Sequence, residues 1–356
     1  MTHLIDAHVL ENKINQLFTT LGSSASEAQK IASNLVLANL SGHDSHGVGM
    51  APRYVDACLE GNLNLNSSIK VNVDAGVLLG ISGEHGFGQV IGEQAMLEAF
   101  KKVKELGACI MGVSNSHHLG RIGHFAEMAV QHGWVSIHFV SVCSRPVVAP
   151  FGGADGRFGT NPCCIGIPVG WGEQKEPFIL DFATSRVAQG KMRVAHNEDR
   201  QIAEGILIDE NGYPTTNPGV VVKPNAEGRL GALLPFGEYK GFGLAVACEI
   251  LGGALTGGGT WHRIYDGRKA VLNSMLTIII DPKKLGSQES FIQETEAFLN
   301  WLRLSPNAPG TDGVVLAGEP ERAKRKERLT RGIEIDDVTW QELVDAGNKV
   351  GFNFNQ

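Results

Sequence analysis

Two short stretches of the chain gather imidazole, hydroxyl and carboxylate groups at a density typical of reaction sites. The first, "SGHDSHG" (residues 41–47), has two histidines around an aspartate and a serine, bounded by glycines. The second, "SNSHHLGRIGHFAEMA" (residues 114–129), follows an apolar segment and opens a helix-like pattern. Side chains and backbone N–H groups at such a junction can face a ligand. Both stretches are therefore candidate parts of one site.

These histidines admit three interpretations. Helix capping by Asp44 or Ser45 would leave the histidines at the surface. A metal-dependent hydrolase or lyase is the second interpretation, and its ligands would be His43, His46, His117 and His118. Neither stretch has the spacing of a zinc site, such as H-E-x-x-H, so the sequence predicts no metal. Proton transfer by a neutral imidazole whose pKa lies near 7 is the interpretation we favour.

Two more polar segments lie where predicted strands end. "LDFATS" (residues 180–185) runs from a strand towards a helix, with Asp181 and the N–H groups of Thr184 and Ser185 at the junction. This arrangement suits a ribose or a phosphate, although ordinary capping by Thr184 or Ser185 would produce the same pattern. Lys240 in "PFGEYKGFG" precedes an apolar helix, and its alternative interpretation is a surface lysine.

The stretch "GEHGFGQVIGEQ" is close to a dinucleotide-binding turn but does not match it. The fingerprint G-x-G-x-x-G needs three glycines at fixed spacing, and here Gly86, Gly88 and Gly92 are one residue too far apart at the last step. The next predicted strand ends in Ser114 and Asn115 instead of an acidic residue that could bind ribose. We therefore predict a structural turn at this point.

The elements that must position these groups divide the chain into three regions. Residues 1–68 predict helices, one of which begins with Ser24 and Glu27 at capping-box spacing. Residues 69–282 carry strand patterns such as "IKVNV", "ACIMGV", "WVSIHFVS" and "SMLTIII" between helical segments, so they predict an α/β region. Within it, "GFGLAVACEILGGAL" predicts a helix buried on all sides. Residues 283–356 return to amphipathic helices, which we expect to pack with the N-terminal ones.

Composition narrows the possible partners. A net charge of −7 argues against a nucleic-acid surface, and the basic run "RAKRKERLTR" alternates with glutamate like a solvated helix face. No segment resembles a signal peptide or is apolar for long enough to cross a bilayer. The six cysteines form no C-x-x-C pair, which favours free thiols in a reducing compartment. We therefore expect a cytoplasmic protein.

Several motifs together resemble those of the type-2 malate/L-lactate dehydrogenase family, a non-Rossmann group of NAD(P)-dependent oxidoreductases. They are "GHDSHGVGMAPRYV", "NSHHLGRIGHFAEMA", "FGTNPCCIGIP", "LDFATSRVAQGK", "LPFGEYKGFGLAVACEIL" and "LAGEPE". They occur in family order and cover nearly the whole chain. The resemblance implies an α/β fold with a large mixed sheet that carries the cofactor, and helices from both chain ends packed together. It also implies a homodimer that transfers a hydride between NAD(P)H and a 2-oxo acid to give a 2-hydroxycarboxylate. The resemblance leaves NAD and NADP both open, and we expect NAD.

The resemblance also implies roles for individual residues. His118 would be the catalytic acid/base, and His46 would lie beside the nicotinamide and the substrate with Ser45 and Tyr54. The cofactor would contact His46, Gly120, Arg121, Ile122, Leu180, Asp181, Phe182, Ala183, Lys240, Asn273, Gly318 and Glu319.

One position departs from the family pattern. Many members carry an arginine four residues after the histidine of D-S-H, where it can bind a substrate carboxylate in bidentate fashion. This chain has Met50 there, and Arg53 and Arg121 are the nearby candidates for that task. We therefore expect a substrate larger or more apolar than malate, unless Met50 simply packs against its own helix.

Overall fold

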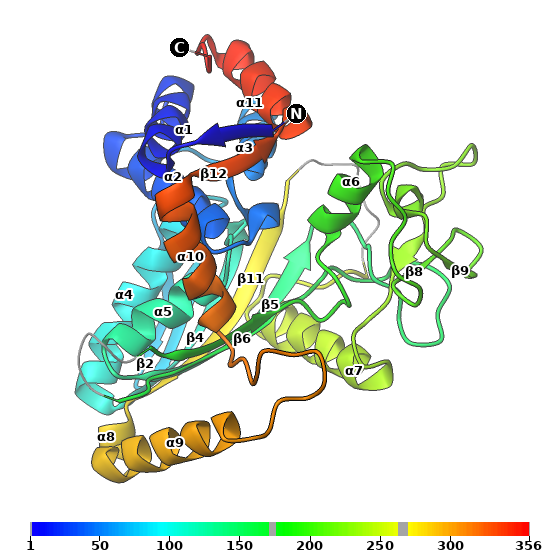
Figure 1. The fold of residues 1–356 in the computed structure, drawn as a ribbon. Coiled ribbons are helices and arrows are strands. Elements are labelled where there is room, and N and C mark those ends of the chain that lie inside the picture. Colours follow the sequence, from blue (N-terminus) through cyan, green and yellow to red (C-terminus); the bar gives the residue numbers. More distant parts are fainter. Residues whose placement is uncertain (1, 171–175, 263–269, 356) are drawn as a thin grey trace.

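In a computed structural model, which describes residues 2–170, 176–262 and 270–355, both ends of the chain build one helical unit. Its N-terminal part is a strand followed by three helices, β1 (Thr2–Ile5), α1 (Ala7–Leu21), α2 (Ala25–Leu40) and α3 (Ala51–Leu59). Its C-terminal part comprises α10 (Glu319–Arg331), β12 (Ile333–Asp336) and α11 (Asp337–Val350). Strands β1 and β12 pair antiparallel, and both termini lie on this unit (Figure 1).

An apolar core explains why the two ends meet. Leu10, Ile14 and Tyr54 from the first 60 residues share one buried cluster with Ile333 and Leu343 from the last 24. Such burial contributes about 25 cal/mol to the free energy of unfolding for each Å² of apolar surface removed from water. Ser24 begins α2 as predicted, since its hydroxyl accepts a hydrogen bond from the Glu27 N–H at 3.3 Å.

A seven-stranded mixed sheet forms the rest of the scaffold, which confirms the predicted α/β fold class. Its strands run in the order β2 (Lys70–Ala75), β3 (Leu78–Ser82), β4 (Ala108–His117), β11 (Leu272–Ile280), β5 (Val135–Cys143), β6 (Cys163–Ile167) and β7 (Phe178–Phe182). Strands β3 and β4 are parallel and the other neighbours are antiparallel. Helices α4 (Gly88–Leu106) and α5 (Gly123–Gln131) cover one face of the sheet (Figure 1).

The apolar segment on the other face differs from its prediction. It forms α7 (Tyr239–Cys248) and a π-helical turn, η4 (Glu249–Ala254), that pack on β5 and β11. The outer side is open, because Tyr239 is 60% exposed, Ile250 52% and Leu255 64%. The prediction of burial on all sides is therefore wrong for the single chain. A sequence pattern does not show how many layers cover a helix.

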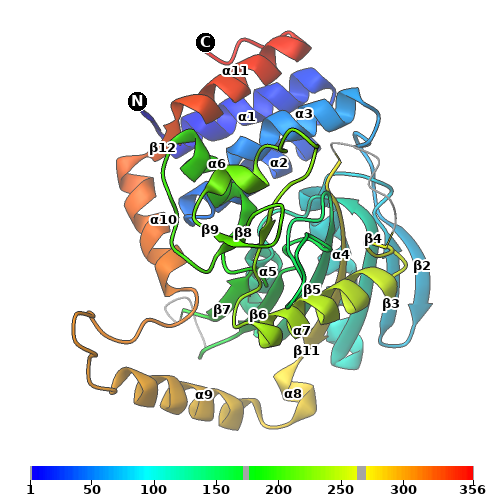
Figure 2. The same ribbon diagram turned by 90° about the vertical axis from the view of Figure 1, so that its right-hand side faces the viewer.

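A smaller region beside the sheet approaches the helical unit (Figure 2). It contains α6 (Gln189–Asn197), η3 (Pro218–Val221) and a three-stranded sheet of β10 (Ala232–Leu233), β8 (Leu207–Ile208) and β9 (Pro214–Thr215). Helix α6 meets the helical unit directly, since a Cβ atom on Gly190 would lie 2.6 Å from the Cβ of Ser45. This contact needs a glycine and brings α6 against the first histidine-containing turn.

The chain between the sheet and α10 follows the edge of the molecule. It consists of α8 (Pro282–Leu285), α9 (Gln288–Arg303) and a connection that leads back to α10 (Figures 1 and 2). Helix α9 lies beside the sheet, away from the N-terminal helices, and exposes Phe298 and Trp301. Among the described residues, no helix combines the length and the hydropathy that a membrane span requires.

Candidate active site

His118 lies in the loop between β4 and α5. Strand β4 runs further than predicted, to His117, because Ser116 and His117 pair with Asn273 and Leu272 of β11. The Asn273 side-chain oxygen then accepts a hydrogen bond from the Leu119 N–H at 2.8 Å, which holds the loop directly after His118. Gly120 follows with φ +75°, a left-handed conformation that favours glycine.

His46 lies in a short 3-10 turn, η1 (Asp44–His46), directly after α2. Asn39 of α2 fixes this turn at both ends: its amide nitrogen donates to Asp44 at 2.6 Å, and its oxygen accepts from the Val48 N–H at 2.8 Å. Gly47 between them has no room for a side chain, because a Cβ atom would lie 2.1 Å from the Asn39 oxygen. The Ser45 hydroxyl is 3.0 Å from Nδ1 of His46.

The structure brings the two predicted catalytic histidines together. The rings of His46 and His118 are stacked, with centroids 5.5 Å apart and an interplanar angle of 21°. Tyr54 of α3 completes the group, since its hydroxyl is 2.5 Å from Nδ1 of His118. His118 therefore has Nε2 left for a substrate.

Burial and neighbouring charges keep these imidazoles neutral. Burial, followed by the charges of His46, His117 and Arg53, lowers the pKa of His118 well below its ordinary value. Burial also lowers the pKa of His46 to about 4, with smaller contributions from His43 and Arg121. Burial raises the pKa of Tyr54, so its hydroxyl stays protonated. A neutral histidine beside a hydroxyl that keeps its proton can exchange a proton with a substrate through Nε2.

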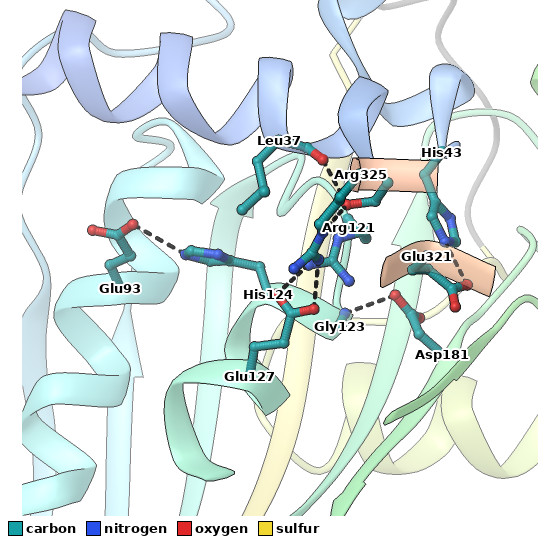
Figure 3. A network of polar contacts seen from close by, with 11 residues as sticks. Leu37, His43, Glu93, Arg121, Gly123, His124, Glu127, Asp181, Glu321 and Arg325 are labelled. Carbon is teal, nitrogen blue, oxygen red and sulfur yellow. Dashed lines mark hydrogen bonds and ion pairs between the residues drawn. The ribbon is translucent and has the colours of Figure 1, made fainter. Parts of the chain in front are cut away.

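Arg121, a candidate for both substrate and cofactor, is engaged in a buried ion-pair network (Figure 3). Its guanidinium donates to one oxygen of Glu127 at 2.5 Å, and Arg325 of α10 donates to the other at 2.5 Å. Although burial alone would raise the pKa of Glu127, the charges of both arginines lower it. Arg121 is only 3% exposed, so the network holds its guanidinium away from solvent.

The remaining substrate candidates differ in their surroundings. Met50 ends η2 (Val48–Met50), is partly buried and packs against the apolar core of the helical unit. Arg53 of α3 lies close enough to His117 and His118 for its charge to lower both pKa values. Of the two arginines considered from the sequence, Arg53 is the one whose charge lowers the pKa of His118, whereas the charge of Arg121 lowers the pKa of His46.

Most of the cofactor candidates gather around the end of β7. Asp181 accepts a hydrogen bond from the Gly123 N–H at 2.7 Å, and burial raises the pKa of its carboxyl group against the charge of Arg121 (Figure 3). Gly318, with φ +94°, borders β7, because its Cβ position is 3.3 Å from the Ile179 nitrogen. Strand β7 is the sheet edge, and Leu180, Phe182 and Ala183 are partly exposed there, whereas Ile122 is buried.

The last two cofactor candidates, Lys240 and Glu319, have other neighbours. Lys240 is exposed, with its ammonium 5.9 Å from the centre of the Tyr239 ring. The preceding segment reaches β7, since the rings of Phe236 and Phe182 are 5.6 Å apart. Glu319 is held by its own helix start and by Arg303, at 2.5 Å.

The glycine-rich turn at residues 86–92 is filled by protein. A Cβ atom on Gly88 would lie 2.2 Å from the carbonyl oxygen of His118, and one on Gly92 would lie 2.3 Å from the ring of Phe125. These glycines allow α4 to pack against the loop that carries His118. This close packing agrees with the structural turn that the sequence predicts.

Sequence reasoning missed several residues that shape this site. Gln89 donates a hydrogen bond to the Tyr54 hydroxyl at 2.8 Å, and Asn39 holds the η1 turn. Arg328 of α10 forms two hydrogen bonds with Asp44, at 2.7 and 3.0 Å, although we expected its basic run to be a solvated helix face. Amides and helix-surface arginines carry no spacing signal, because their roles depend on contacts far along the chain.

Comparisons with known proteins show which family the chain belongs to. A family model described as malate/L-lactate dehydrogenase matches residues 5–344. Hydroxycarboxylate dehydrogenase B of Escherichia coli is 44% identical over 351 residues, which cover 98% of this chain and 95% of that protein. L-lactate dehydrogenase of Cupriavidus necator is 36% identical, with 89% of each chain covered. The solved sulfolactate dehydrogenase of Methanocaldococcus jannaschii has a TM-score of 0.86 at 30% identity, with 99% of each chain covered.

These matches and the paired histidines define an oxidoreductase that acts on 2-hydroxy acids. The chain belongs to the malate/L-lactate dehydrogenase family, as its motifs indicate. Membership implies a nicotinamide cofactor and a small acid as substrate. Nothing in the comparisons favours the metal-dependent hydrolase or lyase. Within the described ranges, no three histidine, cysteine or acidic side chains are grouped so that they could hold a metal ion.

Proposed function

We propose that the protein is an NAD(P)-dependent 2-hydroxycarboxylate dehydrogenase in which His118 is the acid/base. The observation that carries the proposal is the environment of this side chain. It is buried, stacked on His46 and bonded through Nδ1 to Tyr54, so Nε2 remains for the substrate oxygen. Reduction of a 2-oxo acid needs a proton for the developing alkoxide, and a positioned imidazolium both supplies it and stabilises the charge.

The residues around β7 fit a nicotinamide dinucleotide in their chemistry. Asp181 offers a carboxylate to a ribose hydroxyl, and Gly318 lies beside β7 at the edge of the sheet. His46, Gly120, Leu180 to Ala183, Lys240, Asn273 and Glu319 would complete the cofactor site. When bound, the nicotinamide would supply or accept the hydride. We prefer NAD over NADP, and the comparison of the two coenzymes described below tests this preference.

Substrate choice is proposed to depend on the apolar side chain at position 50. Met50 offers a flexible apolar surface where an arginine would bind a second carboxylate. We assign binding of the first carboxylate to Arg53, because its charge lowers the pKa of His118. Ser45, beside His46, and Tyr54 would contact the substrate oxygen atoms. We therefore propose bulky or aromatic 2-oxo acids as better substrates than small dicarboxylates.

We also propose that two chains associate through the open side of α7 and η4. The exposed side chains of Tyr239, Ile250 and Leu255 form an apolar surface of the kind that marks protein interfaces. Light scattering that gave the mass of a single chain would contradict this homodimer. The six cysteines form no disulfide, and four of them are buried, which supports our proposal of a cytoplasmic location.

The decisive experiment measures oxidation of NADH and of NADPH with pyruvate, oxaloacetate and phenylpyruvate. We expect turnover with at least one acid and a higher kcat/KM with NADH. His118→Ala should lower kcat by about a hundredfold or more, the usual scale for loss of a positioned acid/base, while the Kd for NADH changes much less. Near-normal turnover of this variant would move the acid/base role to His46. Metal analysis of the active protein tests the alternative function, a metal-dependent hydrolase or lyase.

A further inference from the structure

We propose that Gln89 is a positioning residue that controls, through Tyr54, which nitrogen of His118 carries a proton. The inference rests on the proposed role of His118 as acid/base and adds a residue that never contacts the substrate. Gln89 of α4, Tyr54 of α3 and His118 after β4 form a continuous chain of hydrogen bonds. Gln89 and Tyr54 are fully buried and His118 is 8% exposed, so water does not compete along the chain.

The direction of the chain follows from its first donor. The amide nitrogen of Gln89 can only donate, and it lies 2.8 Å from the Tyr54 oxygen. The Tyr54 hydroxyl therefore accepts from Gln89 and gives its own proton to Nδ1 of His118, 2.5 Å away. Neutral His118 then carries its proton on Nε2. The chain thus selects one tautomer without placing any charge beside the imidazole.

The protonated state of His118 requires the opposite direction. Nδ1 then carries a proton of its own, so the Tyr54 oxygen must accept it and the hydroxyl proton needs another acceptor. The side-chain oxygen of Gln89 is buried and has no hydrogen-bond partner. Rotation of the amide by about 180° would present this oxygen to Tyr54, because the two ends of an amide have similar shapes. The chain can therefore serve both protonation states.

A second buried amide lies beside the first. The oxygen of Asn34 in α2 also has no partner, although Asn34 is only 3% exposed. Its oxygen and the amide nitrogen of Gln89 are 2.9 and 3.4 Å from the position that a Cβ atom would occupy on Gly120. Buried amide oxygens without donors are costly unless another state of the protein uses them. The Gln89 nitrogen, not its oxygen, lies on this side in the orientation that bonds to Tyr54.

The titratable neighbours of His118 cannot make this selection. His46 from η1, Arg53 from α3 and His117 from the end of β4 all oppose protonation of His118, and none of them bonds to Nδ1. Tyr54 stays protonated because burial raises its pKa. The neutral side chain of Gln89 is thus the group from α4 that can favour one hydrogen-bond direction over the other.

The test compares Gln89→Leu and Gln89→Glu with the wild-type enzyme, using the pH midpoint of kcat/KM for 2-oxo acid reduction. Leucine removes the acceptor for the Tyr54 proton, so the imidazolium is destabilised and the midpoint should fall by about one pH unit. An ionised glutamate only accepts, which favours the imidazolium and should raise the midpoint. Gln94→Leu, on the same helix but bonded to the Ile69 N–H, is the matched control and should leave the midpoint unchanged. Lower kcat with the same midpoint in both Gln89 variants would overturn the proposal.

Nitrogen NMR of His118 in the free protein provides a readout that needs no activity. We expect the Nε2–H tautomer in the wild type and the Nδ1–H tautomer in Gln89→Glu. If the tautomer changes but His118→Ala keeps its turnover, the acid/base assignment fails and the positioning chain stands. If His118→Ala is inactive but Gln89→Glu retains the wild-type tautomer, the positioning proposal fails and the acid/base assignment stands. If Gln89→Leu does not fold, the Gln89→Glu variant alone tests the proposal.

Discussion

Met50 is the residue at which substrate preference can be tested most directly. It lies four residues after His46, partly buried against the core of the helical unit. If its side chain also faces the substrate, Met50→Arg would create a cation for a second carboxylate. We expect the ratio of kcat/KM for phenylpyruvate to that for oxaloacetate to fall about tenfold in the variant. Met50→Leu, which keeps the apolar surface, should retain the wild-type ratio. A ratio that Met50→Arg also leaves unchanged would show that Met50 serves only packing.

Single residues also show how far sequence reasoning reaches. The two histidines and Tyr54 were predicted from motifs, and the structure brings all three together. Arg121 was predicted to face a ligand, yet its guanidinium is paired with Glu127. Arg325, about 200 residues further along the chain, binds the other oxygen of the same carboxylate. Local spacing identifies groups capable of chemistry, whereas their partners are set by the fold.

At the scale of elements, α10 links the proposed cofactor region to the η1 turn. It begins at Glu319 beside β7, and three of its side chains bind the segment after α2: Glu321 bonds to His43, Arg325 to Ser41 and Arg328 to Asp44. These residues follow one another at helical spacing and therefore share one face of α10. A helix that resembles a solvated charged face in sequence thus positions the turn that carries His46.

This link predicts the effect of removing one bond. Arg328 is 17% exposed on its side chain, so its bidentate pair with Asp44 is partly shielded from water. We expect Arg328→Gln to lower kcat/KM by about fivefold, mainly through a higher KM, because the turn loses one support but keeps Asn39. Stability should fall by only about 1 kcal/mol, as for other solvent-accessible ion pairs. Arg331→Gln, on the same helix but 68% exposed, should match the wild type. Equal KM values for both variants would contradict a positioning role for α10.

The elements that sequence patterns described well are those whose burial is decided locally. Strands β5 and β11 lie in the sheet interior and were recognised from their apolar runs. The pairing of β1 with β12 was not predicted, since it joins residues more than 300 positions apart. Helix α7 was expected to be buried all round, and its outer side is open in the single chain. Pairing between distant segments and the number of layers that cover a helix leave no periodic signal in the sequence.

At the scale of the whole molecule, the site lies where two cores meet. The helical unit contributes His46 and Tyr54, and the sheet region contributes His118 and Asp181. We propose that these parts act as domains with boundaries near residues 68 and 282, and that the last helices join the N-terminal domain. Groups placed at such a junction are desolvated by both cores, which is why its histidines are buried and neutral.

Buried neutral histidines also predict how the whole protein responds to acid. Burial lowers the pKa of His46 to about 4, and the pKa values of His117 and His138 to about 3. In the unfolded chain these groups titrate near 6.5, so between pH 6.5 and 4 the unfolded state binds more protons and the free energy of unfolding must fall. At pH 5, about 1.5 units below the pKa of an unfolded histidine, each buried neutral histidine should lower the free energy of unfolding by about 2 kcal/mol. The raised pKa values of Glu27 and Asp181 act in the opposite direction but involve fewer groups.

His138 allows this expectation to be measured away from the active site. It lies on β5, where its two ring nitrogens are 3.0 Å from the hydroxyls of Thr277 and Ser136. In His138→Gln, an amide that does not titrate replaces the imidazole between these hydroxyls. Chemical unfolding at pH 7 and pH 5 should therefore show a smaller loss of stability in the variant, by about 2 kcal/mol. The carboxylates whose pKa values are lowered lose their contribution only below about pH 4.5, outside this window. If the variant and the wild type lost the same free energy between pH 7 and pH 5, protonation of His138 would not be part of the acid response.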